Sequence, residues 1–226
     1  MCSVNPEDKV CACHSIGNLS DQEEARAKIV EKKFARMCAP FLMESDSVVV
    51  GAALGCLYNL SCQGPEVVHH LVSQDILTPL LTLISQFGGI VDVSNKQKKI
   101  ESEKIIEDSF NLLWNLLQED TEAIEVFNRS QIIQKLTPFM SSIVSPSVRV
   151  SCLSLLVTSC EGNLPAQEVI SEHLDNVANI VSNSDEDNLV RITAALLLVT
   201  ACNDKQKIMN NQVYSKYLLF SDAIAT

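Results

Sequence analysis

Residues 51–61 read GAALGCLYNLS, the most informative segment of this sequence for the fold. An apolar run over Ala52–Leu57, suited to a helix, leads into Asn-Leu-Ser at 59–61. The same Asn-Leu-Ser stands 41 residues earlier, at 18–20, behind a second apolar run over Cys11–Ile16. A helix ending that recurs at this distance predicts a chain built from helical repeats.

Repeats of similar length continue through the rest of the chain. Val148–Val150 matches Val190–Ile192 at a spacing of 42 residues. Trp114–Leu116 matches Tyr58–Leu60 at a spacing of 56, and the excess has a local source in a lysine-rich polar stretch from 88 to 104. A period of about 40–47 residues is typical of armadillo and HEAT repeats.

The matches predict a single solenoid over residues 1–226, with a polar insertion loop at 88–104. The repeats are expected at about 5–43, 44–87, 105–145, 146–184 and 185–226, the last being incomplete. Apolar Leu218–Phe220 stands near the end of the last repeat. Because terminal repeats normally carry a polar outer face, we expect either a partner that covers this end or a sequence that is a fragment or short isoform.

Apolar residues within a repeat recur at helical spacing. Ile106, Phe110, Leu113, Trp114 and Leu117 share one face of a predicted helix over 105–118. A single repeat cannot cover such a face, so neighbouring repeats must stack on it. The predicted fold is therefore all-α: a right-handed α-solenoid of armadillo/HEAT-type repeats, an α-α superhelix. Trp114, the sole tryptophan, is expected in the core, although partial exposure at the edge of the groove would permit both core packing and contact with a guest.

Composition favours a mostly helical protein. The chain is 46% hydrophobic with only 7 Gly and 7 Pro, which favours helices over the many turns of an all-β fold. Nine cysteines, an odd number, and an opening without a secretory pattern predict reduced thiols. Apolar stretches fall short of the roughly 20 residues that cross a bilayer, so no membrane span is expected.

The chain is strongly acidic. Its net charge of −11 disfavours direct binding to nucleic acid and attracts basic partners. The same acidity can also serve only solubility. Asp185–Asp187 is open to both interpretations, as a contact for a basic guest or as a solvated turn.

A candidate site lies on the helix over 105–118, opposite its apolar stripe. Asp108, Asn111, Asn115 and Gln118 follow spacings of three and four and so share a face. The Asn amide has a donor and an acceptor, which suits the backbone of an extended guest peptide. Asn18 and Asn59 hold the matching position in earlier repeats, and Tyr58 and Trp114 flank the ladder. The alternative is that these Asn side chains end helices or bond a loop carbonyl.

Other patterns are weaker. Cys11, Cys13 and His14 lie in a helical run without a second ligand pair, and adjacent His69 and His70 diverge on a helix, so no metal site is predicted. The sequence has no phosphate loop, nucleophile elbow or zinc helix. We expect no enzyme activity, no cofactor and no metal.

A family resemblance adds to this reading. Residues 51–61 resemble the third helix of an armadillo repeat, which lines the groove. Together with Asp75–Leu80, Asn111–Asn115 and Val126–Asn128, they resemble the family of HEAT repeat-containing protein 3 and the fungal symportins. The similarity is clearest from about residue 44 to 140, and beyond it the shared feature is mainly repeat spacing.

The resemblance implies an adaptor that chaperones basic large-subunit ribosomal proteins of the 5S particle. It implies import of this cargo into the nucleus with a β-karyopherin, in ribosome biogenesis, and hence a location in cytoplasm and nucleus. The family's basic amino-terminal tail has no matching Lys/Arg cluster here. The alternative function is a general armadillo-repeat scaffold for protein–protein interaction.

Overall fold

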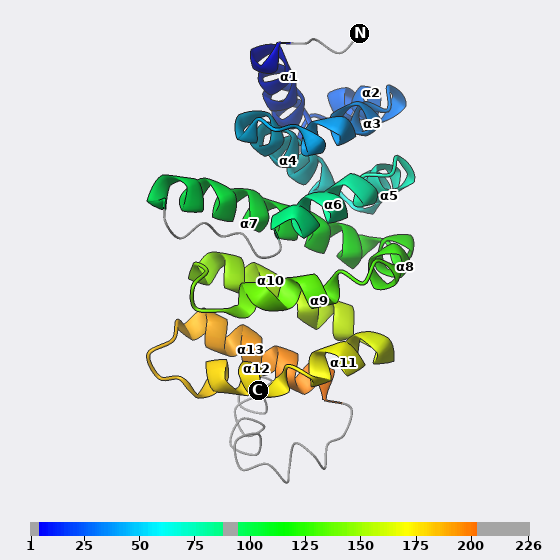
Figure 1. The fold of residues 1–226 in the computed structure, drawn as a ribbon. Coiled ribbons are helices and arrows are strands. Elements are labelled where there is room, and N and C mark those ends of the chain that lie inside the picture. Colours follow the sequence, from blue (N-terminus) through cyan, green and yellow to red (C-terminus); the bar gives the residue numbers. More distant parts are fainter. Residues whose placement is uncertain (1–4, 88–94, 203–226) are drawn as a thin grey trace. The chain divides into compact units, whose positions relative to one another are not determined.

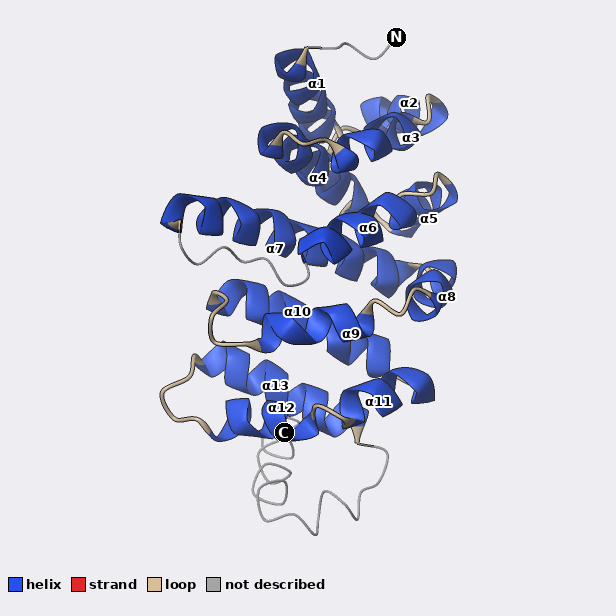
Figure 2. Cartoon of the chain, viewed as in Figure 1, coloured by secondary structure: helices blue, strands red, loops and turns tan. Residues whose placement is uncertain are grey.

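The chain folds into stacked helices. The computed structural model describes residues 5–87 and 95–202, and within these ranges all regular structure is helical (Figures 1 and 2). Contacts between residues divide the chain into two compact units, Met1–Ile132 and Ile133–Thr226.

The described helices alternate between long and short. The first unit contains α1 (Pro6–Leu19), α2 (Glu23–Glu31), α3 (Phe34–Cys38), the 3-10 helix η1 (Ala39–Met43), α4 (Ser47–Ser61), α5 (Pro65–Ser73), α6 (Leu77–Phe87), α7 (Lys96–Glu119) and α8 (Thr121–Arg129). The second contains α9 (Ile133–Leu136), the 3-10 helix η2 (Thr137–Met140), α10 (Pro146–Cys160), α11 (Leu164–Ser171), α12 (Leu174–Ser182) and α13 (Asn188–Ala201).

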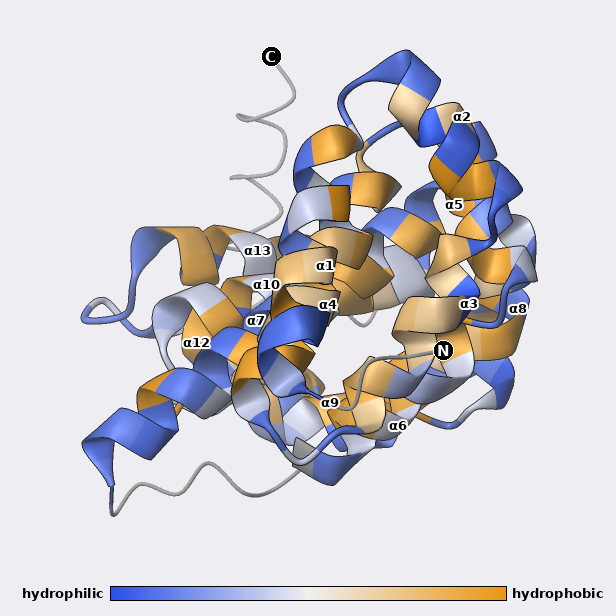
Figure 3. Cartoon of the chain, turned by 90° about the horizontal axis from the view of Figure 1, so that it is seen from above, coloured by the Kyte–Doolittle hydropathy of each residue, from blue (hydrophilic) through white to orange (hydrophobic). Residues whose placement is uncertain are grey.

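The long helices stack on one another within each unit. α4 packs between α1 and α7 in the first unit, and α10 packs against α13 in the second. Pairs of short helices connect them and cover the core. Most helices carry hydrophobic residues on one side and hydrophilic residues on another, as expected for half-buried helices (Figure 3). Phe110, Phe127 and Leu57 are fully buried in the first unit, and Phe139 is buried in the second.

Side chains that cap helices mark the start of several elements. Asp46 accepts a hydrogen bond from the Val48 N–H at the start of α4, at 2.9 Å. Asp187 accepts from Leu189 N–H and Val190 N–H at the start of α13. Such caps satisfy amides that have no partner in the first turn of a helix.

The prediction of a loop over 88–104 is wrong for its described part. Helix α7 begins at Lys96, and the Asn95 side chain caps it by accepting from Gln97 N–H and Lys98 N–H. Lys, Gln and Glu are good helix formers, and pairs such as Lys99–Glu103 support the first turns of the helix. Polar composition alone does not separate an exposed helix from a loop. Residues 88–94 lie outside the described ranges.

Some of the predicted repeat ranges agree with the observed helices better than others. Each of 5–43 and 44–87 holds one long helix followed by short ones. The predicted third repeat, 105–145, crosses from one compact unit into the other, because α8 belongs to the first and α9 to the second. Of the fifth range, 185–226, the structure describes residues through 202, including α13, and the rest of that prediction lies outside the described residues.

Arg149 and Arg191, which recur one repeat apart, anchor long helices to the preceding short ones. The Arg149 Nε–H donates to the Met140 carbonyl and the Arg191 Nε–H to the Val181 carbonyl, each at 3.1 Å. These carbonyls lie at or near the ends of η2 and α12. A guanidinium is suited to such carbonyls because its several N–H donors have fixed directions.

Among the described helices, none is by itself both long and apolar enough to cross a membrane. The consecutive segments Pro65–Ser73 and Leu77–Gln86 pass that test only as a pair, and they are bent by 78° at their junction.

Candidate peptide-binding face

Two stacked helices carry most of the predicted site. Tyr58 and Asn59 lie in the last turn of α4, and the predicted ladder runs along α7. On α7 the residues Asp108, Asn111 and Asn115 are half-buried and Gln118 is exposed. We call the exposed side of these two helices the α4–α7 face, and define it by Tyr58, Asn59, Asp108, Asn111, Trp114, Asn115 and Gln118.

The core prediction for Trp114 is wrong. Ile106, Phe110, Leu113 and Leu117 are buried as predicted, but 40% of Trp114 is exposed. Trp114 lies three residues after Asn111 and four after Phe110, which puts it at the border between the polar side and the apolar stripe of the helix. Tyr58 is 38% exposed, so the α4–α7 face presents two aromatic rings.

The Asn amides bond to the preceding long helix. The Asn115 Nδ2 group donates to Ser61 Oγ at 2.9 Å and to Cys62 Sγ at 3.4 Å. The Asn59 Nδ2 group donates to the Gly17 carbonyl at 3.4 Å. The nitrogen atoms therefore hold neighbouring helices together, but their acceptors are a carbonyl within α1 and a side chain of α4 rather than the loop carbonyl of the alternative interpretation.

The oxygen atoms of the same amides have a different environment. Neither Asn59 Oδ1 nor Asn115 Oδ1 accepts a hydrogen bond from another described residue. Each Nδ2 bond fixes the orientation of its amide, so each Oδ1 stands in a set direction at the surface. The face therefore offers oriented acceptors for N–H donors of a guest.

Gly17 permits the close approach of α1 to α4. A Cβ atom at this position would lie 3.3 Å from Asn59 Nδ2 and 3.3 Å from Cys56 Cα. Since real Cβ contacts are rarely so short, a side chain here would push the helices apart. Asn18, next to Gly17, is exposed and has no side-chain hydrogen bond within the described ranges. The sequence match between Asn18 and Asn59 therefore does not extend to the same contact.

Lys104 is a charged neighbour of this face that the sequence interpretation missed, because it assigned this residue to a loop. Its Nζ lies 2.7 Å from Asp108 Oδ1, four residues on. The hydrogen bond to Asp108 raises the pKa of Lys104, although partial burial opposes it. Asp108 is thus committed to a cation of the same helix, which leaves less of its charge for a guest.

Tyr58 lies in the electrostatic field of this pair. Negative charge at Cys62 is the main cause of its raised pKa, followed by partial burial. Asp108 acts in the same direction and Lys104 against it. The Tyr58 hydroxyl therefore keeps its proton and remains a hydrogen-bond donor at neutral pH.

The Cys and His side chains considered for metal binding do not come together in one group within the described ranges. The Cys13 and Cys38 sulfurs, both buried, lie 3.8 Å apart, while Cys11 and His14 are exposed. His69 Nδ1 lies 2.8 Å from Asp120 Oδ2. Within the described ranges no three His, Cys, Asp or Glu side chains form a group that suits a metal ion.

Comparison with known proteins finds relatives by sequence. The chain is 28% identical over 166 residues to human HEAT repeat-containing protein 3, and 30% identical over 168 residues to the mouse protein of that name. Each match covers 70% of this chain and 24% of the relative. The chain therefore spans about a quarter of the length of these curated relatives. No protein-family model matches it.

Solved structures share the fold at low identity. An engineered protein aligns with a TM-score of 0.70 at 15% identity, over 96% of this chain and 89% of that one. A designed armadillo repeat protein in complex with the peptide (KR)4 aligns with a TM-score of 0.53 at 15% identity, over 88% of this chain and 100% of that one. The predicted all-α solenoid of armadillo/HEAT repeats and the resemblance to HEAT repeat-containing protein 3 are both confirmed. These similarities are consistent with a protein-interaction scaffold.

Proposed function

We propose that this repeat protein is a non-enzymatic adaptor that holds an extended, basic segment of another protein on the α4–α7 face. One observation carries the proposal. Asn59 and Asn115 use their Nδ2 groups to hold the preceding helix, and this leaves their oriented Oδ1 atoms as acceptors. Backbone N–H groups of an extended chain match such acceptors whatever the guest's sequence.

Charge and aromatic residues support a basic guest. The net charge of −11 attracts Lys- and Arg-rich segments over a distance. The exposed rings of Tyr58 and Trp114 suit the stems and cations of such side chains. A protein of similar fold is bound to the peptide (KR)4, so this architecture is compatible with a basic peptide.

The resemblance to HEAT repeat-containing protein 3 suggests which cargo this is. We extend the proposal to basic large-subunit ribosomal proteins of the 5S particle. In this role the chain serves their chaperoning and import with a β-karyopherin, in cytoplasm and nucleus. The acidic charge suits this cargo because ribosomal proteins that contact RNA are basic.

Binding measurements with a paired variant test the mechanism. The probes are a Lys-Arg octapeptide and the purified ribosomal proteins of the 5S particle, each at low and moderate salt. We expect Asn59→Ala/Asn115→Ala to weaken binding at least about tenfold, since two acceptors are lost. Emission of Trp114, the sole tryptophan, gives a local signal that should shift when a guest binds.

Two further variants separate binding from folding. Asn59→Asp/Asn115→Asp keeps an oxygen at each position but removes the Nδ2 donors to the Gly17 carbonyl and to Ser61 Oγ, so its acceptors lose their orientation and it should bind more weakly than wild type despite its added negative charge. Gln22→Ala/Gln134→Ala removes two exposed amides elsewhere and should have no effect. Thermal unfolding of each variant reports whether the fold survives. Binding that persists in the Ala variant would instead favour the alternative, a scaffold that joins partners through other surfaces.

A further inference from the structure

The second compact unit contains a cavity of about 580 Å³ that is lined by both polar and apolar side chains. It is bounded by η2 and the residues that follow it, by Arg149 of α10 and by one side of α12. Val177, Ala178 and Val181 form the buried side of α12, while Asn176, Asn179 and the half-buried Ile180 line the cavity. The cavity shares no residue with the α4–α7 face.

A second amide ladder lines this cavity. Asn176, Asn179 and Asn183 follow spacings of three and four on α12 and at its end, and all three are exposed. Within the described ranges the side chains of Asn176 and Asn179 have no hydrogen-bond partner. Asn183 Oδ1 accepts from the Asp185 N–H at 3.1 Å. Most of the hydrogen-bonding capacity of the ladder is therefore open to a ligand.

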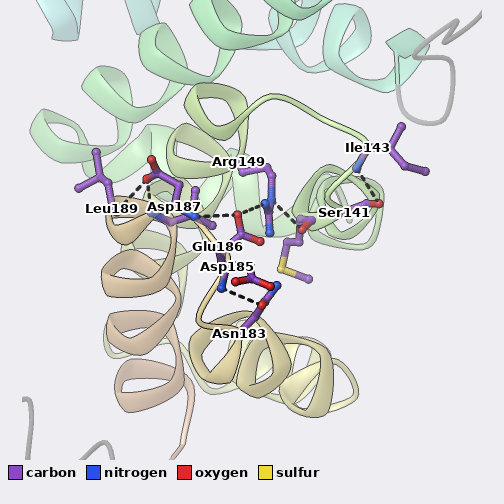
Figure 4. A network of polar contacts seen from close by, with 10 residues as sticks. Ser141, Ile143, Arg149, Asn183, Asp185, Glu186, Asp187 and Leu189 are labelled. Atoms are coloured by element: carbon purple, nitrogen blue, oxygen red, sulfur yellow. Dashed lines mark hydrogen bonds and ion pairs between the residues drawn. The ribbon is translucent and has the colours of Figure 1, made fainter.

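A buried ion pair forms another wall (Figure 4). Only 3% of Arg149 is exposed, and its Nη1 lies 2.6 Å from Glu186 Oε1. Arg149 Nε–H also donates to the Met140 carbonyl, and Glu186 Oε1 also accepts from the Asp187 N–H. These bonds hold both side chains in place. They leave Arg149 Nη2 and Glu186 Oε2 without a partner among the described residues, and both residues line the cavity.

The chemistry of the lining selects the class of ligand. Amides, one guanidinium and one carboxylate offer donors and acceptors together, and the two charges cancel. Such a set suits the alternating N–H and C=O groups of a peptide backbone better than a free ion. We propose that this cavity is a second protein-binding site, which takes an extended peptide segment that carries Lys or Arg.

The length of the Asn ladder and the charge around the cavity indicate what kind of peptide segment would bind there. Asn176 and Asn183 are seven residues apart, about 10.5 Å along a helix, which equals about three residues of extended chain. Exposed Glu172, Asp175 and Asp185 stand nearby in the sequence. From 133 to 202 the chain has three basic and seven acidic residues, so the local balance is 3 − 7 = −4. The acidic surroundings favour basic side chains beside the bound backbone.

Photo-crosslinking on the full chain tests the site. The probe is a Lys-Arg octapeptide with one benzoylphenylalanine near its centre, and adducts are mapped by mass spectrometry. We expect adducts on residues 137–142 or on α12. The variant Asn176→Ala/Asn179→Ala should lose these adducts and bind there at least about tenfold more weakly. Adducts on the α4–α7 face should be unchanged in that variant.

Controls decide between backbone recognition and charge alone. Gln134→Ala, an exposed amide of the same unit that does not line the cavity, should keep the adducts. Asn179→Arg should abolish them by adding bulk and positive charge at an exposed position. A probe with N-methylated backbone amides and the same charge should not label the cavity.

The proposal is overturned by any of three results. These are the absence of adducts on residues 137–142 and α12, adducts that survive both Asn variants, or equal labelling by the N-methylated probe. Because Ala is a better helix former than Asn, the double variant should fold, and thermal unfolding checks this. If no guest binds at the α4–α7 face but the cavity is still labelled, only the function proposed above is contradicted.

Discussion

Asp120 shows how one side chain can serve two elements. It ends α7, caps α8 by accepting from the Ala123 N–H at 3.0 Å, and lies 2.8 Å from His69 Nδ1. Burial by itself would raise the pKa of this carboxyl group. The hydrogen bonds from His69 and the Ala123 N–H outweigh burial and hold the pKa below its ordinary value.

This lowered pKa predicts a stability difference that depends on pH. A carboxyl group whose pKa is lower in the folded chain stabilises it above the unfolded value, about 3.9, and this contribution is lost as pH falls through the folded value. We expect Asp120→Ala to lower the free energy of unfolding by about 1–2 kcal/mol at pH 7. The gap to wild type should close as acid protonates Asp120.

Urea unfolding followed by Trp114 fluorescence at pH 7 and at pH 3 measures this gap. His69→Ala is the matched control, because it keeps the cap and removes only a partner whose side chain is 72% exposed. It should cost less than Asp120→Ala, as exposed ion pairs contribute little. A gap that is the same at both pH values would contradict the assignment.

At the scale of elements, three turns between consecutive short helices each contain a residue with a positive φ angle. Lys33, Asp75 and Gln131 have φ values of 53°, 58° and 54°. They stand just before α3, near the start of α6, and just before α9. This left-handed conformation is unfavourable for residues with a Cβ atom, by about 1–2 kcal/mol. The backbone at each of these turns is therefore formed against local preference.

Glycine should relieve this strain where the side chain has no other role. We expect Lys33→Gly to leave the free energy of unfolding unchanged or raise it by up to about 1 kcal/mol. Lys28→Gly, which removes the same charge from the exposed side of α2, should lower it by about 1 kcal/mol. Urea unfolding of both variants gives the comparison. Equal losses in the two would show that the Lys33 backbone is not strained.

At the scale of the whole molecule, charge repulsion opposes compactness. The chain has 28 acidic and 17 basic residues. Several of the basic groups form ion pairs with acidic side chains, such as Lys104 with Asp108 and Arg149 with Glu186. The remaining excess of negative charge lies mainly at the surface, where salt screens it.

Salt should therefore stabilise the fold and weaken binding of basic peptides. We expect the thermal midpoint to rise between about 10 mM and 150 mM NaCl, as the screening length falls from about 30 Å to 8 Å. Sucrose at equal osmolality is the control for effects that do not depend on charge. A midpoint that falls with salt, or that follows sucrose alone, would contradict this prediction.

The sequence by itself determined the class of fold and the side of α7 that faces the core. Both follow from spacing along the chain, since buried residues recur at helical intervals and repeats recur at about 42 residues. Phe110, Leu113 and Leu117 were recognisable as core for this reason. Composition likewise determined the acidic character that favours a basic partner.

Only the tertiary structure decided features that depend on partners far along the chain. Trp114 lies at the edge of the apolar stripe, so the packing of neighbouring helices sets its exposure. Asn115 bonds Ser61, and Arg149 bonds Glu186, at separations of 54 and 37 residues. No local pattern encodes such pairs, because they arise when one repeat stacks on the next. The orientation of the Asn oxygens and the second amide-lined cavity both follow from that stacking.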